Sequence, residues 1–193
     1  PNKARKPDGG GQPSPLKRTN ANRMTRVASP CGHADLTRPM NLSSLLYPAT
    51  VRANVQLDAK KALFPYVGEL AARSLGLDAG EVSEALLERE RLGSTGFGRG
   101  IALPHAKMAD LNGVRGMFLQ LARPIDFQAV DGLPVDLLFV LLSPLDAGAD
   151  HLKALAGVSR MLRNDSIAER LRGAKNDEAL YAMLVDAEAR DAA

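Results

Sequence analysis

The chain has no tryptophan, a single cysteine and few aromatic side chains. Aromatic residues make up 4% of the 193 residues and hydrophobic residues of all kinds 45%, so we expect a sizeable and largely aliphatic core. The lone cysteine, Cys31, excludes an internal disulfide and fits a reducing compartment. The longest apolar run is "LLFVLL" at 137–142, well short of the ~18 residues that a membrane-spanning helix needs. With no apolar leader stretch either, we expect a cytoplasmic protein that does not insert into membranes.

Positive charge is concentrated at the N-terminal end. The overall net charge is +3. Residues 1–39 hold eight basic and two acidic residues, a net charge of +6, and residues 40–193 hold the other 17 basic and 20 acidic residues, a net charge of −3. Because binding to phosphate backbones needs clustered cations, we do not expect the body of the chain to bind nucleic acid.

The first 39 residues read as a tail. They contain half of the prolines, three consecutive glycines and few large apolar residues, so they cannot bury enough surface to offset their ordering entropy. We expect residues 1–39 to be a disordered basic tail and residues 40–193 to form one domain. A cleaner stretch, "MNLSSLL", begins at Met40, and we take as a hypothesis that the native chain starts there. An alternative is that the tail binds nucleic acid or acidic lipid.

Hydrophobic periodicity predicts an α/β domain. A short strand at 51–55 precedes two amphipathic helices, and Pro65 should interrupt and kink the first of them. Alternation at 114–121 is typical of a half-buried strand. The run "VDLLFVLL" at 135–142, apolar except for Asp136, is typical of a central strand covered on both faces. Later helices follow, the first from about Asp150 with Leu152, Leu155, Ala156 and Ser159 on one face.

The second amphipathic helix carries an arginine on its apolar stripe. Val82, Ala85, Leu86 and Arg89 follow the spacing i, i+3, i+4, i+7. Arg89 therefore lies where the pattern expects an apolar residue. It either has a functional role, or it extends its charged end to solvent or caps the helix C-terminus.

A glycine-rich loop leads into one of only three histidines. The sequence "STGFGRGIALPHAK" at 94–107 lacks the Gly-Lys-Ser/Thr of a phosphate-binding loop, and its GxGxG spacing is not a dinucleotide fingerprint. Alternating glycines allow unusual backbone angles and the close approach of an anion or another backbone, or they simply form a flexible loop. Pro104 fixes the backbone before His105.

The second histidine of the body, His151, falls in the first turn of a helix that follows the central strand. His105 and His151 are too far apart in sequence for a one-helix metal site, and His33 lies in the tail, so we expect no metal and no other cofactor. No serine or cysteine nucleophile motif and no nucleotide loop is found. Imidazole is then the best candidate reactive group: a neutral ring nitrogen can attack phosphorus, with Arg89 and His151 as donors to the added dianion. The alternative is that each histidine is an ordinary core or surface residue.

Three segments together resemble a known family. These are "RERLGSTGFGRGIALPHAK" (89–107), "DGLPVDLLFVLLSP" (131–144) and "HLKALAGVSRMLRND" (151–165). They resemble the enzyme IIA domain of the bacterial phosphoenolpyruvate-dependent phosphotransferase system, fructose/mannitol superfamily, and look most like its nitrogen-regulatory branch. The resemblance runs from about 42 to 185.

The resemblance implies a mixed, largely parallel five-stranded sheet between helices. It implies that His105 is phosphorylated on Nε2 by a histidine phosphocarrier protein, that His151 helps to hold the phosphoryl group, and that Arg89 is the active-site arginine. In the nitrogen branch the protein would act on regulatory targets such as transporters or sensor kinases. Two alternatives stay open: a sugar-specific IIA that passes phosphate to a IIB domain, and a hydrolase with His105 as base and His151 as acid.

Overall fold

The structure is a computed structural model that describes residues 42–191. The expected tail at 1–39, including Cys31 and His33, and the hypothetical start at Met40 lie outside the described residues. The strands are β1 (Val51–Val55), β2 (Gly96–Gly98), β3 (Ile101–Ala102), β4 (His105–Met108), β5 (Arg115–Ile125) and β6 (Val135–Pro144). The helices are α1 (Leu42–Leu45), η1 (Pro48–Thr50, a 3-10 turn), α2 (Lys60–Leu75), α3 (Ala79–Arg91), α4 (Gly148–Leu162), α5 (Asp165–Arg172) and α6 (Asp177–Asp191).

The strands form one mixed sheet with the order β1-β5-β6-β3-β2, and β4 also pairs with β6. The pairs β1–β5, β3–β6 and β4–β6 are parallel, whereas β5–β6 and β2–β3 are antiparallel. The predicted mixed α/β sandwich is confirmed, with six strands where five were expected. One of the six, β2, is formed by the glycine-rich loop itself.

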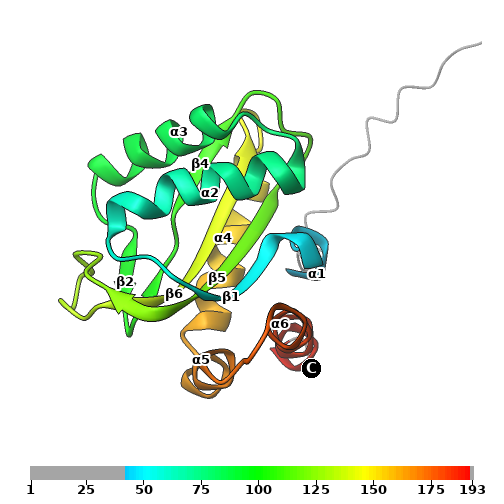
Figure 1. The fold of residues 1–193 in the computed structure, drawn as a ribbon. Helices are drawn as coiled ribbons and strands as arrows, with labels where there is room; N and C mark the ends of the chain where they lie inside the picture. Colours follow the sequence, from blue (N-terminus) through cyan, green and yellow to red (C-terminus); the bar gives the residue numbers. More distant parts are fainter. Residues whose placement is uncertain (1–41, 192–193) are drawn as a thin grey trace, which may run out of the picture. The chain divides into compact units, whose positions relative to one another are not determined.

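Helices cover both faces of the sheet, and each face has its own apolar core (Figure 1). α2 and α3 pack on one face, while α1, α4, α5 and α6 pack on the other. The strand at 135–142 is central and buried on both faces as expected. β5 is not half-buried as its alternation suggested: Met117 and Leu119 enter one core and Phe118 the other, because helices lie over both of its faces. No helix within residues 42–191 combines the length and apolar character needed to cross a bilayer.

The expected interruption at Pro65 is wrong, because α2 is a single helix from Lys60 to Leu75 that contains it. Proline removes one backbone donor and leaves the carbonyl four residues earlier without its helical partner. That residue, Lys61, and Pro65 are both exposed, so water can satisfy the carbonyl and the helix tolerates the loss.

The face of α4 that the sequence analysis singled out is not the face that packs on the sheet. Leu152 is 65% exposed and Ala156 is exposed, whereas His151, Ala154 and Val158 are buried. Two stripes of similar apolar content run along this helix, and the sequence does not say which one meets the sheet. The outcome turns His151 inward, toward the edge of the sheet where β4 begins.

The glycine loop is an ordered hairpin. Arg99 and Gly100 form the two-residue turn between β2 and β3, and both have positive φ, 58° and 75°, as a type I′ hairpin turn requires. The Arg99 N–H donates to Asp131 Oδ2 at 2.7 Å. Leu103 and Pro104 then separate β3 from β4 along the same edge of β6, so His105 is the first residue after a proline break in the ladder.

Candidate active site

Both ring nitrogens of His105 have defined partners. Nδ1 lies 2.9 Å from the carbonyl oxygen of Leu103, and Arg89 Nε lies 2.9 Å from Nε2. A carbonyl can only accept and a guanidinium can only donate, so Nδ1 carries the proton and Nε2 presents a lone pair. Burial lowers the pKa of His105 below its ordinary value of 6.5, and the nearby Arg89 charge also lowers it, against the hydrogen bond to Leu103. The ring is therefore neutral at pH 7, with Nε2 as its nucleophilic atom.

Arg89 lies in the last turn of α3, at the end of the stripe that includes buried Val82 and Leu86. Its side chain is half-buried. Besides its bond to His105, its Nη1 donates to the carbonyl of Gly93 at 3.0 Å, just beyond the helix end. The arginine thus satisfies a carbonyl at the helix C-terminus, as a capping role requires, and the same side chain also reaches a histidine.

His151 lies in the first turn of α4 and is 8% exposed. Its Nδ1 forms a hydrogen bond with the Ser143 hydroxyl near the end of β6. Its ring centroid is 5.5 Å from that of His105. Burial, followed by the adjacent His105 and Lys107, lowers the pKa of His151. Two neutral imidazoles therefore face one space, each oriented through Nδ1.

That space is a cavity of about 690 Å³ whose lining includes Arg89, His105 and His151. Its other charged lining residues are Glu88, Arg91 and Lys107, so cations outnumber the acid at its mouth and favour an anionic ligand. A second cavity of about 420 Å³ opens beside the glycine hairpin and shares Arg89 and His105. The structure thus brings all three predicted site residues to one place.

Sequence reasoning missed the residues that orient the site. Ser143 is fully buried, and its signal was a lone hydroxyl at the end of the apolar run "LLFVLLS", eight residues before His151. Glu90, beside Arg89, is also buried, although it stands in the charged run "ERER" that usually marks an exposed face. Within residues 42–191, no cluster of three or more His, Cys, Asp or Glu side chains is arranged to hold a metal ion.

The arrangement can bring a neutral imidazole lone pair to an incoming oxyanion that Arg89 and His151 stabilise. The family described as "Phosphoenolpyruvate-dependent sugar phosphotransferase system, EIIA 2" matches residues 44–187. The chain belongs to this family.

Among its relatives, the chain is 43% identical to a nitrogen regulatory protein of Bradyrhizobium diazoefficiens, over 75% of this chain and 95% of that one. It is 45% identical to a nitrogen regulatory protein of Escherichia coli, over 77% and 92% of the two chains. Among solved structures, nitrogen regulatory protein IIA-Ntr from Neisseria meningitidis superposes with a TM-score of 0.69 at 35% identity, over 73% and 97%. The chain is thus a homologue of nitrogen regulatory IIA proteins.

Proposed function

We propose that this protein is a cytoplasmic phosphohistidine carrier of the nitrogen-type relay, and that Nε2 of His105 accepts the phosphoryl group from a histidine phosphocarrier protein. The observation that carries the proposal is the state of that ring: Nδ1–H donates to the Leu103 carbonyl, which leaves the Nε2 lone pair facing Arg89 in a shared cavity with His151. Membership of the enzyme IIA family supports a donor of this kind.

In the transfer step, the Nε2 lone pair of His105 attacks the phosphorus of the donor's phosphohistidine. The new N–P bond forms as the donor's N–P bond breaks, and that bond's electron pair returns to the donor ring. The His105 ring keeps its Nδ1 proton, and the Leu103 carbonyl stabilises the positive charge that develops on the ring. Reversal of the same step hands the group on.

Arg89 and His151 hold the transferring group. Before transfer, Arg89 Nε donates to the atom that will bear phosphorus, so its guanidinium must turn to the phosphoryl oxygens as the bond forms. If the Ser143 hydroxyl donates to Nδ1 of His151, the proton of that neutral ring is on Nε2, where it can donate to a phosphoryl oxygen. Preorganised donors of this kind are the main resource in phosphoryl transfer.

An apolar rim surrounds the site and suits protein docking. Leu92 lines the main cavity and is 86% exposed, Val130 lines the second cavity and is 88% exposed, and Leu152 follows His151 in α4. Exposed apolar residues gathered around a reactive centre mark an interaction surface. Both the phosphocarrier and a regulatory target would use this surface, so that phosphorylation of His105 changes the charge at the centre of the interface.

The nitrogen branch is favoured over a sugar-specific role by the relatives named nitrogen regulatory protein, which align over nearly their whole lengths. In this role the protein binds transporters or sensor kinases differently in its two phosphorylation states. The alternative is a sugar-type IIA, which would pass phosphate to a IIB domain. Incubating the phosphorylated protein with a IIB domain distinguishes the two, because only the sugar-type role predicts rapid transfer.

The test of the carrier function is reconstitution of the relay. The protein is mixed with phosphoenolpyruvate, the first enzyme of the relay and its histidine phosphocarrier, and labelling is measured by mass spectrometry. We expect one phosphoryl group per chain, none in His105→Ala, and slowed onward transfer in a folded His151→Ala. Absence of labelling in the unmodified protein would refute the carrier function. Continuous turnover of a small phosphate ester with a bell-shaped pH profile would instead support the hydrolase alternative.

A further inference from the structure

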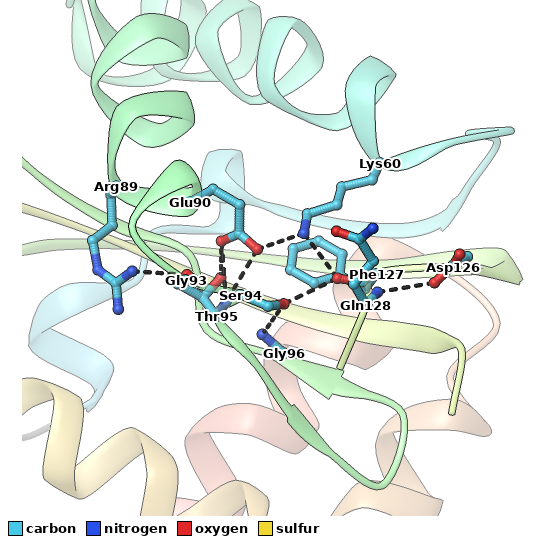
Figure 2. Close-up of polar contacts among 10 residues, drawn as sticks. All are labelled: Lys60, Arg89, Glu90, Gly93, Ser94, Thr95, Gly96, Asp126, Phe127 and Gln128. Carbon is cyan, nitrogen blue, oxygen red and sulfur yellow. Dashed lines mark hydrogen bonds and ion pairs between the residues drawn. The ribbon is translucent and has the colours of Figure 1, made fainter. Parts of the chain in front are cut away.

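We propose that Glu90 is a positioning residue for phosphoryl transfer, whose buried carboxylate holds the backbone that fixes the tautomer of His105. The inference rests on the proposed function for its consequence, but its structural claim concerns the unphosphorylated ring. Glu90 follows Arg89 directly in α3. Its carboxylate points toward Thr95 and Lys60 (Figure 2), and Glu90 does not line the cavity that holds His105.

The carboxylate of Glu90 is held from two sides. Its side chain is 6% exposed, and Oε1 lies 2.6 Å from Nζ of Lys60 at the start of α2. On the other side it accepts the backbone N–H of Thr95 at 3.0 Å and the Thr95 hydroxyl at 2.6 Å. A buried carboxylate is costly unless it is paired and hydrogen-bonded, so this set of contacts strongly restricts where Thr95 can lie.

Lys60 links the carboxylate of Glu90 to the segment that follows β5. Its Nζ donates to the carbonyl of Phe127 at 2.8 Å and lies 4.3 Å from the centre of the Phe127 ring. The Ser94 hydroxyl donates to the same carbonyl at 3.0 Å (Figure 2). Ser94, directly before Thr95, is therefore held by the same carbonyl as Lys60, which restricts the segment between α3 and β2.

From Thr95 a continuous series of hydrogen bonds leads to the reactive ring. The carbonyl of Thr95 accepts the N–H of Leu103 at 3.0 Å. The carbonyl of Leu103 accepts Nδ1–H of His105 at 2.9 Å. The position of the acceptor that keeps the proton on Nδ1 thus depends, two hydrogen bonds away, on the carboxylate of Glu90.

Arg89 connects the other side of the His105 ring to the same segment of the chain. Nε of Arg89 donates to Nε2 of His105, and Nη1 donates to the carbonyl of Gly93, two residues before Thr95. Figure 2 shows Arg89 and Glu90 leaving the helix end to either side of this segment. The His105 ring has two partners, the Leu103 carbonyl at Nδ1 and the Arg89 guanidinium at Nε2. Each of them is hydrogen-bonded to the segment at 93–95, which Glu90 holds in place.

The negative charge of Glu90 acts on His105 in a second way. Burial is the largest influence and lowers the pKa of His105, whereas the Glu90 carboxylate opposes that shift. The geometry does not depend on this contribution, and the test below separates the two by comparing a neutral hydroxyl deletion with a charge deletion.

The experiment measures the tautomer of His105 by ¹⁵N NMR of its imidazole at pH 8, in the full unphosphorylated chain, together with the initial rate of labelling through the relay. The informative variants are Thr95→Val, which deletes one hydroxyl, and Lys60→Met with Glu90→Gln, which removes the buried charge pair together. Thr95→Ser restores the hydroxyl. Glu84→Gln, an exposed glutamate on the same helix, is the matched charge control.

We expect the unmodified ring, Thr95→Ser and Glu84→Gln to be almost wholly in the Nδ1–H form. In Thr95→Val and in the double variant, the ratio of Nε2–H to Nδ1–H should rise about tenfold, the effect of losing roughly one ordinary hydrogen bond. Labelling should slow by about ten- to a hundredfold, as expected for a misplaced nucleophile. If the double variant does not fold, Thr95→Val alone decides.

A tautomer ratio and labelling rate unchanged in folded Thr95→Val would overturn the proposal, as would an equal effect of Glu84→Gln. Failure of the proposed function looks different. In that case the unmodified protein is not labelled at all, while the tautomer measurement still reports whether Glu90 holds the ring.

Discussion

At the scale of single residues, the proposed chemistry depends on which nitrogen of an imidazole carries a proton. The Leu103 carbonyl keeps the proton of His105 on Nδ1, and Arg89 meets the lone pair on Nε2. Arg89 also donates to the carbonyl of Gly93, which holds its guanidinium beside the ring. In the proposed transfer the guanidinium turns from there to the phosphoryl oxygens. A guanidinium can hold two phosphoryl oxygens at once, which an ammonium cannot do with the same geometry.

Replacing Arg89 with lysine should therefore slow phosphate acceptance although the charge is kept. Loss of one charge-assisted hydrogen bond at about 1.5–3 kcal/mol predicts a roughly ten- to 150-fold lower initial rate of labelling. Arg73→Lys is the control, since Arg73 is exposed on α2 and pairs with Glu69. Equal labelling rates for Arg89→Lys and the control would show that the planar, two-pronged guanidinium is not required for phosphate acceptance.

The lowered histidine pKa values predict the response to acid. Burial lowers the pKa of both His105 and His151 below 6.5, so the folded protein binds protons less readily than the unfolded chain. The stabilisation is complete above about pH 6.5 and is lost as the pH falls through the lower, folded-state values. Denaturant unfolding should show a falling free energy of unfolding below pH 6.5, and less steeply in His151→Gln. Ring titrations by NMR at or above 6.5 would contradict this account.

The three candidate residues that line one cavity could be selected from the sequence because their types are rare or unexpected at their positions: two histidines in the body, and an arginine on an apolar stripe. Their supporting groups could not. The partner of His105 is a backbone carbonyl, which any residue supplies, and Glu90 looks like an exposed charge until Lys60 is placed beside it. Such partners are defined by tertiary contact and leave no pattern in the chain.

At the scale of elements, α2 and α3 pack closely, and their closest contact lies at the start of the helix that carries Arg89 and Glu90. A Cβ at Gly68 of α2 would lie 2.2 Å from the carbonyl oxygen of Ala79, the first residue of α3. The obstacle is backbone, which cannot rotate away. Only glycine lets the two helices approach this closely at that point.

Gly68→Ala should therefore destabilise the protein, and a second glycine provides the contrast. Forcing the helices apart should cost about 1–3 kcal/mol. Gly157 in α4 has open space where its Cβ would stand, so Gly157→Ala should raise the free energy of unfolding by about 0.5–1 kcal/mol. Urea titrations of both variants measure the difference. Similar changes of one sign in both would show that the helix contact is not the determining factor.

Elements with one unambiguous pattern could be predicted from sequence, and those with two competing patterns could not. The run at 137–142 has no polar interruption and lies within the central strand. α4 offers two stripes, and the one that includes His151 is buried while Leu152 faces solvent. The choice depends on the sheet edge that α4 meets, which is long-range information.

At the scale of the whole molecule, the sheet order brings distant segments to one site. His105 begins β4 and pairs with Leu141 near one end of β6, while α4 returns after β6 to place His151 beside it. The class of fold and the helices on both faces could be predicted from the alternation of elements. The strand order depends on pairings between residues far apart in sequence, and no local pattern encodes it.

The exposed leucine of α4 gives a test of docking at this scale. Leu152→Asp should slow labelling by about tenfold at low phosphocarrier concentration, because it places a charge in an apolar interface, and saturating phosphocarrier should restore the rate. Leu133→Asp is the control: Leu133 is 53% exposed and precedes the opposite end of β6. Equal slowing by both variants would argue against a docking surface around the histidines.

The central claim is that Nε2 of His105 carries phosphorus while Nδ1 keeps its proton. The most direct measurement is NMR of ¹⁵N-histidine-labelled protein after phosphorylation through the relay. The account predicts phosphorus coupling to Nε2 of His105, a retained Nδ1–H, and an unmodified His151 ring. Phosphorus on Nδ1, or on His151, would contradict it.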